Sequence, residues 1–93
     1  MNYTLSYTTK FLHDVKVAKK RGLNLQLLKN VTDILQTGNA LPPQNHDHAL
    51  IGNYKGYREC HITPDWLLIY KKDVELKIIA LHRTGSHSDL FKK

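Results

Sequence analysis

The 93-residue sequence has only one cysteine, Cys60, so no disulfide can form within the chain. This excludes a disulfide-stapled mini-protein and favours a reducing compartment, so we expect a cytoplasmic location. The longest strongly apolar run, residues 66–70, is far shorter than the roughly 20 residues that a membrane span needs. No charged segment followed by an apolar stretch opens the chain, so we expect neither a secretory signal nor a membrane partner.

Acidic residues are also scarce. Eight Asp and Glu stand against 14 Lys and Arg, which gives a net charge of +6. Such an excess on a small protein favours a polyanionic partner, such as nucleic acid, an acidic protein or anionic lipid, although a solvated lysine-rich surface has the same composition. The length predicts a single domain spanning residues 1–93. The six histidines are the unusual feature.

The first half of the chain predicts one strand and two helices. Residues 3–7 alternate with period two, which is typical of a short strand. Thr8 or Thr9 can cap an amphipathic helix with a basic last turn, and Gly22 follows as its terminator. Asn24 can cap a second helix that ends before Gly38. The short connection predicts an antiparallel helical hairpin.

The second half predicts a polar loop and three strands. The strands are expected at residues 57–62, 66–71 and 76–82, and a break at Thr84–Gly85 should lead into a short tail. The order β-α-α-β-β-β predicts an α+β fold. We expect a small, mainly antiparallel sheet with the helical hairpin packed on one face.

Alternation along the strands selects a group of polar residues. Glu59 and His61 should share one face, whereas Cys60 points to the other. Because the helices need an apolar face, His61 and Arg83 are expected on the open face or at strand ends. We expect the residues of this group to lie within about 10 Å of one another. The group comprises Asp47, His48, His61, Asp65, Arg83 and His87.

These residue types suit cleavage of an RNA backbone. Histidines exchange protons near neutral pH, and the planar guanidinium of Arg83 fits a phosphate. Trp66 and Phe91 offer flat faces for base stacking, and Lys55 adds a positive charge for substrate binding. The 2′-hydroxyl of the RNA can itself be the nucleophile, so the protein needs only a base, a cation and an acid.

Each residue also has an ordinary structural interpretation. His61 can be a half-buried strand histidine, Arg83 can pair with Asp65 or Glu59, and Trp66 at the head of an apolar strand can be core. A metal site is the less favoured alternative for the histidines, because no paired cysteines or helical His spacing support it, so we expect no metal and no cofactor. A plain RNA-binding module would instead depend on the basic helix near Lys19.

Several separated motifs in residues 46–91 carry a family resemblance. They are the pair Asp47-His48, the run Gly56–His61, the run Pro64–Tyr70 and the segment Arg83–Phe91. In this order they resemble the YafQ branch of the RelE/ParE toxin superfamily. The resemblance implies a RelE-like fold and a ribosome-dependent mRNA endonuclease whose products carry 2′,3′-cyclic phosphate and 5′-hydroxyl ends.

The resemblance also implies roles for individual residues. His87 is the expected general acid. The general base is expected among His48, His61 and Asp65, and the sequence does not single out one of them. Arg83 would hold the scissile phosphate. The remaining expected site residues bind substrate: Lys55, Trp66 and Phe91. Ala49 stands where the family usually has proline, so we expect the loop that carries His48 to be less constrained.

Partners follow from the same resemblance. It implies a cognate antitoxin that is acidic and partly disordered alone, and mRNA in the ribosome as the substrate. Operator DNA would be bound only through the antitoxin, in a heterotetramer of toxin and antitoxin. ParE-type relatives inhibit DNA gyrase and are not nucleases. That alternative stays open, although a binding inhibitor needs no cluster of proton-transfer groups.

Overall fold

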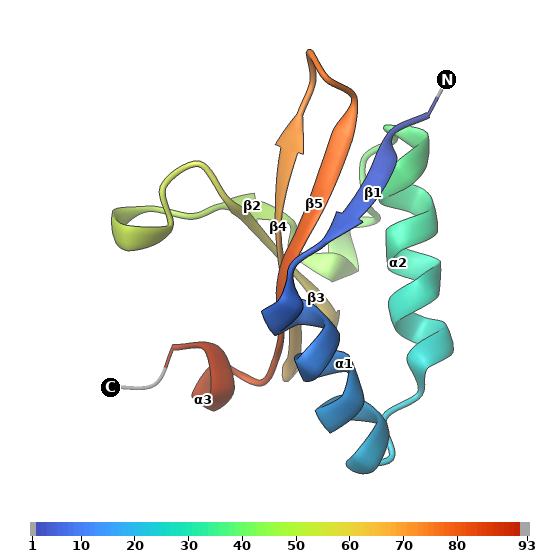
Figure 1. Ribbon diagram of the computed structural model, residues 1–93, viewed down its shortest axis with the longest axis vertical. Coiled ribbons are helices and arrows are strands. Elements are labelled where there is room, and N and C mark those ends of the chain that lie inside the picture. Colours follow the sequence, from blue (N-terminus) through green and yellow to red (C-terminus); the bar gives the residue numbers. More distant parts are fainter. Residues whose placement is uncertain (1, 92–93) are drawn as a thin grey trace.

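The fold is a five-stranded mixed sheet flanked by helices. The computed structural model describes residues 2–91. The strands lie in the order β1-β5-β4-β3-β2, and only β1 and β5 run parallel (Figure 1). The elements are β1 (Thr4–Tyr7), α1 (Thr9–Lys20), α2 (Leu25–Thr37), the 3-10 turn η1 (Pro43–Asn45), β2 (His48–Ala49), the 3-10 turn η2 (Gly52–Tyr54), β3 (Arg58–Thr63), β4 (Trp66–Asp73), β5 (Ile78–Gly85) and α3 (His87–Leu90). The α+β class and the order of the predicted elements are confirmed.

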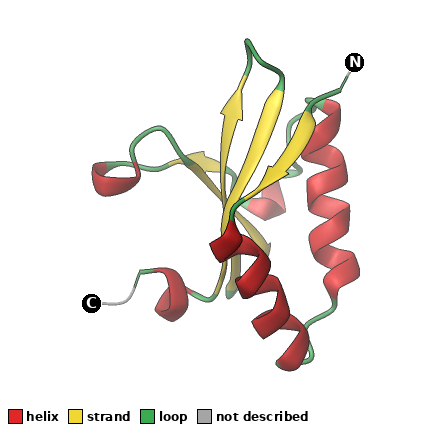
Figure 2. Cartoon of the chain, in the orientation of Figure 1, coloured by secondary structure: helices red, strands yellow, loops and turns green. Residues whose placement is uncertain are grey.

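Both long helices begin where the sequence provides a cap. The side chain of Thr8 accepts a hydrogen bond from the backbone N–H of Phe11, and that of Asn24 accepts one from Gln26. Gly22 has a φ of +78°. This left-handed conformation commonly ends a helix, and glycine adopts it most easily. The cartoon shows the two helices diverging from this turn (Figure 2). No helix within residues 2–91 is long and apolar enough to cross a membrane.

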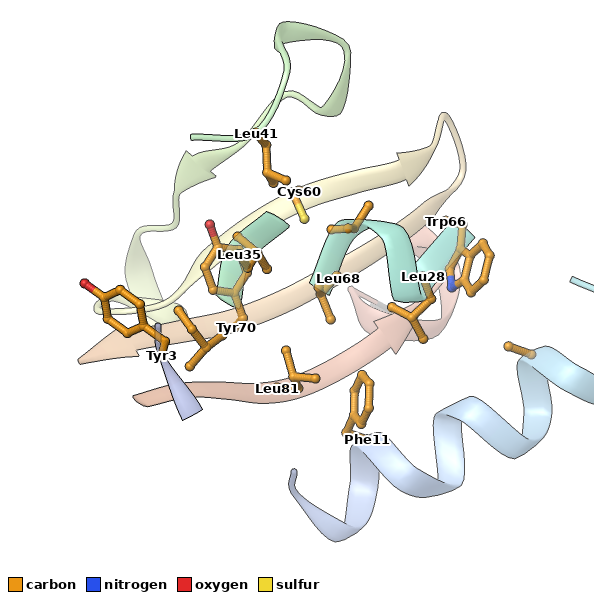
Figure 3. Close-up of a cluster of buried hydrophobic side chains, with 13 residues drawn as sticks. Tyr3, Phe11, Leu28, Leu35, Leu41, Cys60, Trp66, Leu68, Tyr70 and Leu81 are labelled. Carbon is orange, nitrogen blue, oxygen red and sulfur yellow. The ribbon is translucent and has the colours of Figure 1, made fainter. Parts of the chain in front are cut away.

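The main core fills the space between the sheet and the two long helices. Phe11 of α1 and Leu28 and Leu35 of α2 pack toward side chains of the strands (Figure 3). The strand residues of this core that Figure 3 labels are Cys60, Trp66, Leu68, Tyr70 and Leu81. The helical hairpin therefore covers one face of the sheet, as expected.

A smaller core covers part of the opposite face. Leu67 and Ile69 of β4 pack there against Leu90 of α3. Burial on both faces explains why β4 begins with five consecutive buried residues, Trp66–Tyr70, instead of an alternating pattern. The short tail expected near the C-terminus is thus a helix with a packing role, α3, and this face is only partly open.

β5 is longer than expected and irregular. Thr84 and Gly85 do not break the strand, because they pair with Leu68 and Leu67 of β4. Ile69 pairs with Arg83 while the next residue, Tyr70, pairs with Leu81, so His82 is an extra residue in a β-bulge. Strict alternation would put Arg83 on the side of Leu81. The bulge moves it to the side of Ile69, away from the main core.

Cys60 tests the main core directly. The side chain is fully buried, and burial raises the pKa of its thiol to about 12. Because the thiolate is the form that reacts with alkylating agents, we expect iodoacetamide at pH 8 to leave the native protein unlabelled. Mass spectrometry before and after unfolding in guanidinium chloride measures this. Rapid labelling without denaturant would contradict the burial.

Candidate active site

The buried carboxylate of Glu59 organises the open face. Its side chain projects from β3 and the residue is only 5 % exposed. His48 Nε2 lies 3.3 Å and His61 Nε2 lies 3.6 Å from the same carboxylate oxygen, Oε1. A buried carboxylate is costly without such neighbours. The predicted placement of Glu59 and His61 on one face is confirmed, but the sequence-based site did not include Glu59.

His48 is held by a short edge strand. Its Nδ1 lies 2.7 Å from the backbone oxygen of His46, and because a carbonyl only accepts, Nδ1 carries the proton of this hydrogen bond. His48 and Ala49 form β2 and pair with Glu59 and Arg58. Strand pairing therefore constrains the backbone at the position where the family usually has proline, and the effect of Ala49 on the loop stays a prediction.

His87 lies next to His61 and contacts Asp65. The ring centroids of His61 and His87 are 5.8 Å apart, and His87 Nδ1 is 3.3 Å from Asp65 Oδ1. The Nε2 atom of His87 makes no hydrogen bond within residues 2–91. His46 packs edge-on against His61, with the ring centroids 5.4 Å apart. The structure thus brings together three of the predicted residues: His61 of β3, Asp65 of the turn after β3, and His87 at the start of α3.

α3 is positioned by a capping box and an ion pair. The Ser86 side chain accepts from the N–H of Asp89, and the Asp89 carboxylate accepts from the N–H of Ser86. Arg21 at the end of α1 pairs with both oxygens of Asp89, at 2.6 and 3.2 Å, and this lowers the pKa of that carboxyl far below its usual range. Gly85 allows the close approach, because a Cβ there would lie 3.0 Å from Asp89.

Arg83 pairs with Asp14 of α1, not with Asp65 or Glu59. Its Nε and Nη2 atoms lie 2.6 and 3.1 Å from the two carboxylate oxygens. Arg83 and Asp65 line the same cavity, of about 400 Å³, between α1 and the end of β5. Asp65, which contacts His87, thus also borders the cavity that Arg83 lines.

Two predicted residues have other surroundings. Asp47 turns away from His48 and accepts a hydrogen bond from the Tyr70 hydroxyl at 2.6 Å on the helix-covered side. Trp66 is 2 % exposed and its Nε1 donates to the Thr84 hydroxyl at 2.9 Å, so its ring has no free face for a base. The expected stacking by Trp66 is therefore wrong, and the carboxylate of Asp47 does not face the histidines as expected.

Phe91 belongs to an aromatic group beside the cluster. Its ring lies 5.7 Å from Tyr54 and 6.5 Å from His87, centroid to centroid. Tyr57 stacks at 4.7 Å against His82, and burial together with the positive charge of Arg83 lowers the pKa of His82. Lys55 is exposed next to Tyr54 in the loop. Aromatic rings therefore border His87, and Lys55 follows this group in the exposed loop.

The same cluster has a donor set that could hold a metal. Glu59, His61 and His87 each offer one ligand atom, and the three atoms lie within 4.8 Å of one another. Two imidazoles and a carboxylate suit zinc or copper. Without a metal, the same atoms can exchange protons with a substrate.

Comparison with known proteins identifies the class. A family model described as "Bacterial toxin of type II toxin-antitoxin system, YafQ" matches residues 3–92. The mRNA interferase toxin YafQ of Escherichia coli K12 is 40% identical over 88 residues, which are 94% of each chain. The fold and sequence are thus those of a toxin from a type II toxin–antitoxin system. Within that class, the chain belongs to the YafQ family.

Solved structures agree with this assignment. The YafQ of the E. coli DinJ-YafQ toxin-antitoxin complex is 38% identical, with a TM-score of 0.89 over 98% of this chain and 99% of that one. A metal-bound toxin from Helicobacter pylori is 42% identical, with a TM-score of 0.90 over 96% of this chain and 99% of that one. The RelE-like fold expected from the resemblance is confirmed.

The ion pair between Arg21 and Asp89 predicts how α3 is held. Replacing Arg21 with Gln removes the charge that anchors Asp89, so the amides of residues 86–91 should exchange hydrogen for deuterium faster. Lys20→Gln, one residue away, is the matched control because no ion pair involves Lys20 within residues 2–91. Hydrogen-exchange mass spectrometry measures both. Equal protection in the two variants would show that Arg21 does not anchor α3.

Proposed function

We propose that this chain is an mRNA interferase, the toxin of a type II toxin–antitoxin pair, which cuts mRNA in the ribosome by in-line attack of the 2′-hydroxyl. The products would be a 2′,3′-cyclic phosphate and a 5′-hydroxyl end. The observation that carries the proposal is the contact of His87 with both His61 and Asp65 beside the buried Glu59. The name of the E. coli relative supports the same activity.

His87 is the proposed general acid. Asp65 lies at its Nδ1, 3.3 Å away, and thereby orients the ring. Nε2, on the opposite side of the ring, can deliver a proton to the departing 5′-oxygen. Because the side chain is 55 % exposed, a substrate can reach it without rearrangement of the core.

His61 is the better placed of the proposed bases. It contacts His87 on one side, and its Nε2 faces Glu59. When an imidazole takes the proton of the 2′-hydroxyl it becomes positive, and the nearby carboxylate stabilises that charge. His48 Nε2 faces the same carboxylate, and its Nδ1 donates to the His46 carbonyl, so His48 would hold Glu59 in place and not act as the base. Asp65 then orients His87 instead of acting as the base.

Arg83, Phe91 and Lys55 complete the proposed site. The guanidinium would stabilise the extra negative charge that the phosphate carries in the transition state. Phe91, 6.5 Å from His87, would place the nucleotide by stacking, and Lys55 would attract the backbone. None of these steps uses a metal or a cofactor, so we propose a metal-independent reaction.

We further propose a cognate antitoxin and a cytoplasmic site of action. The E. coli relative was solved in complex with DinJ, and a net charge of +6 favours an acidic partner here. Such a partner would be partly disordered alone and would carry any operator binding, in a heterotetramer with the toxin. A gyrase inhibitor or a plain RNA-binding module would not need the arrangement of His61, Glu59 and His87.

Replacement of His87 tests the activity. His87→Gln should slow the cleavage of ribosome-bound mRNA by roughly 100- to 10,000-fold, the usual contribution of a general acid, and should relieve growth arrest. Ser88→Ala, the exposed neighbour in α3, is the control and should remain active. Full toxicity of folded His87→Gln protein would remove His87 from the mechanism. A loss of DNA supercoiling before translation stops would favour the gyrase alternative.

Metal addition tests the independence from metals. Toxin that is stripped with EDTA and then desalted should cleave ribosome-bound mRNA at an unchanged rate. Added Zn²⁺ or Cu²⁺ should inhibit cleavage, because a metal on Glu59, His61 and His87 would occupy the atoms that exchange protons. The rate of cleavage by each toxin sample, in a buffer that keeps the Mg²⁺ of the ribosome, is the measurement. Loss of activity in the stripped toxin that Zn²⁺ or Cu²⁺ restores would mean that the reaction needs a metal.

A further inference from the structure

The carboxylate of Asp14 holds Arg83 from the opposite end of the sequence. Arg83 Nε and Nη2 bond its two oxygens at 2.6 and 3.1 Å, and the backbone N–H of Thr84 bonds Oδ2 at 3.1 Å. The side chain of Asp14 is only 10 % exposed and that of Arg83 22 %. Three hydrogen bonds therefore fix a nearly buried carboxylate against the end of β5.

The end of β1 leaves room for this contact. β1 stops at Tyr7, opposite Leu81, so β5 has no strand neighbour on that side beyond Leu81. The α1 segment replaces the missing strand, because the Thr8 hydroxyl donates to the backbone oxygen of His82 and Asp14 accepts from Thr84. The first contact is to the bulge residue His82 itself, and Arg83 lies between the two contacts. Thr8 and α1 thus hold the backbone of β5 on both sides of Arg83.

The pairing leaves Arg83 with donors for a phosphate. A guanidinium has five N–H groups, and Asp14 takes one at Nε and one at Nη2. The remaining edge, formed by Nη1 and the second N–H of Nη2, can still bind two phosphate oxygens. Asp14 and a phosphate therefore use different edges of the guanidinium and can be bound together.

We propose that Asp14 is a positioning residue that fixes the guanidinium of Arg83 so that its free edge faces the RNA phosphate. The inference rests on the proposed function and assigns Asp14 no contact with the substrate. An alternative is that Asp14 competes with the phosphate and restrains the toxin. The bond from Thr84 disfavours such a gate, because the carboxylate would have to leave a backbone donor without its partner.

Single-turnover cleavage of ribosome-bound mRNA tests the proposal. Asp14→Asn keeps the shape but removes the charge, and the rate at saturating toxin should fall about 10- to 100-fold, as expected when a reacting group is misplaced, with little change in the concentration for half-saturation. Asp33→Asn is the matched control, since Asp33 is also a helical carboxylate in an ion pair, on α2. A rate equal to or above wild type would overturn the proposal.

A double variant separates positioning from a general structural role. In an Arg83→Ala background, Asp14→Asn should cause no further loss of rate, because its effect acts through Arg83. A further loss of the same size in that background would mean that Asp14 only supports the fold. Thermal unfolding of each variant shows that folded proteins are compared.

A measurement without RNA keeps the inference independent of the proposed function. In ¹⁵N NMR spectra the Nε–H of Arg83 should be protected from solvent exchange in the wild type and in Asp33→Asn, and exposed in Asp14→Asn. A wild-type toxin that cuts no mRNA would overturn the proposed function alone. Protection that survives in Asp14→Asn would overturn the positioning by Asp14.

Discussion

The burial of one carboxylate constrains the open face of the sheet. Taking an ionised carboxylate out of water costs several kcal/mol unless other groups compensate. Glu59 meets this condition because imidazoles from β2 and β3 both direct Nε2 toward its Oε1. Within residues 2–91, no buried side-chain nitrogen or oxygen lacks a partner. The contacts that make the burial of Glu59 tolerable therefore also hold the rings of His48 and His61 in a defined geometry.

The second part of the site depends on α1. Asp14 and Arg21 are seven residues apart, two turns of helix, and so they lie on the same face of α1. Asp14 pairs with Arg83 at the end of β5, and Arg21 pairs with Asp89 in α3. Arg83 and the helix that carries His87 are thus both fixed to α1. Their relative position depends on the spacing along α1 as well as on the short connection at Ser86.

Local patterns predicted the helices and much of the open face, and contacts distant in sequence were missed. The caps at Thr8 and Asn24 and the alternation that placed His61 were readable because each depends on neighbouring residues. The pair of Asp14 with Arg83 joins positions 69 residues apart, and no local pattern encodes it. The bulge at His82 breaks the alternation that the prediction assumed. The spacing of Ser86 and Asp89 was a readable capping box for α3, and alternation had already put Glu59 beside His61.

The proposed general acid, His87, lies on an element that is too short to be stable alone. α3 has four residues, too few to form a stable helix alone, so its stability comes from its contacts. These contacts are the packing of Leu90 on β4, the capping box and the ion pair to Arg21. Loss of one of them would release His87 while the main core, which is built on the other face of the sheet, stays folded.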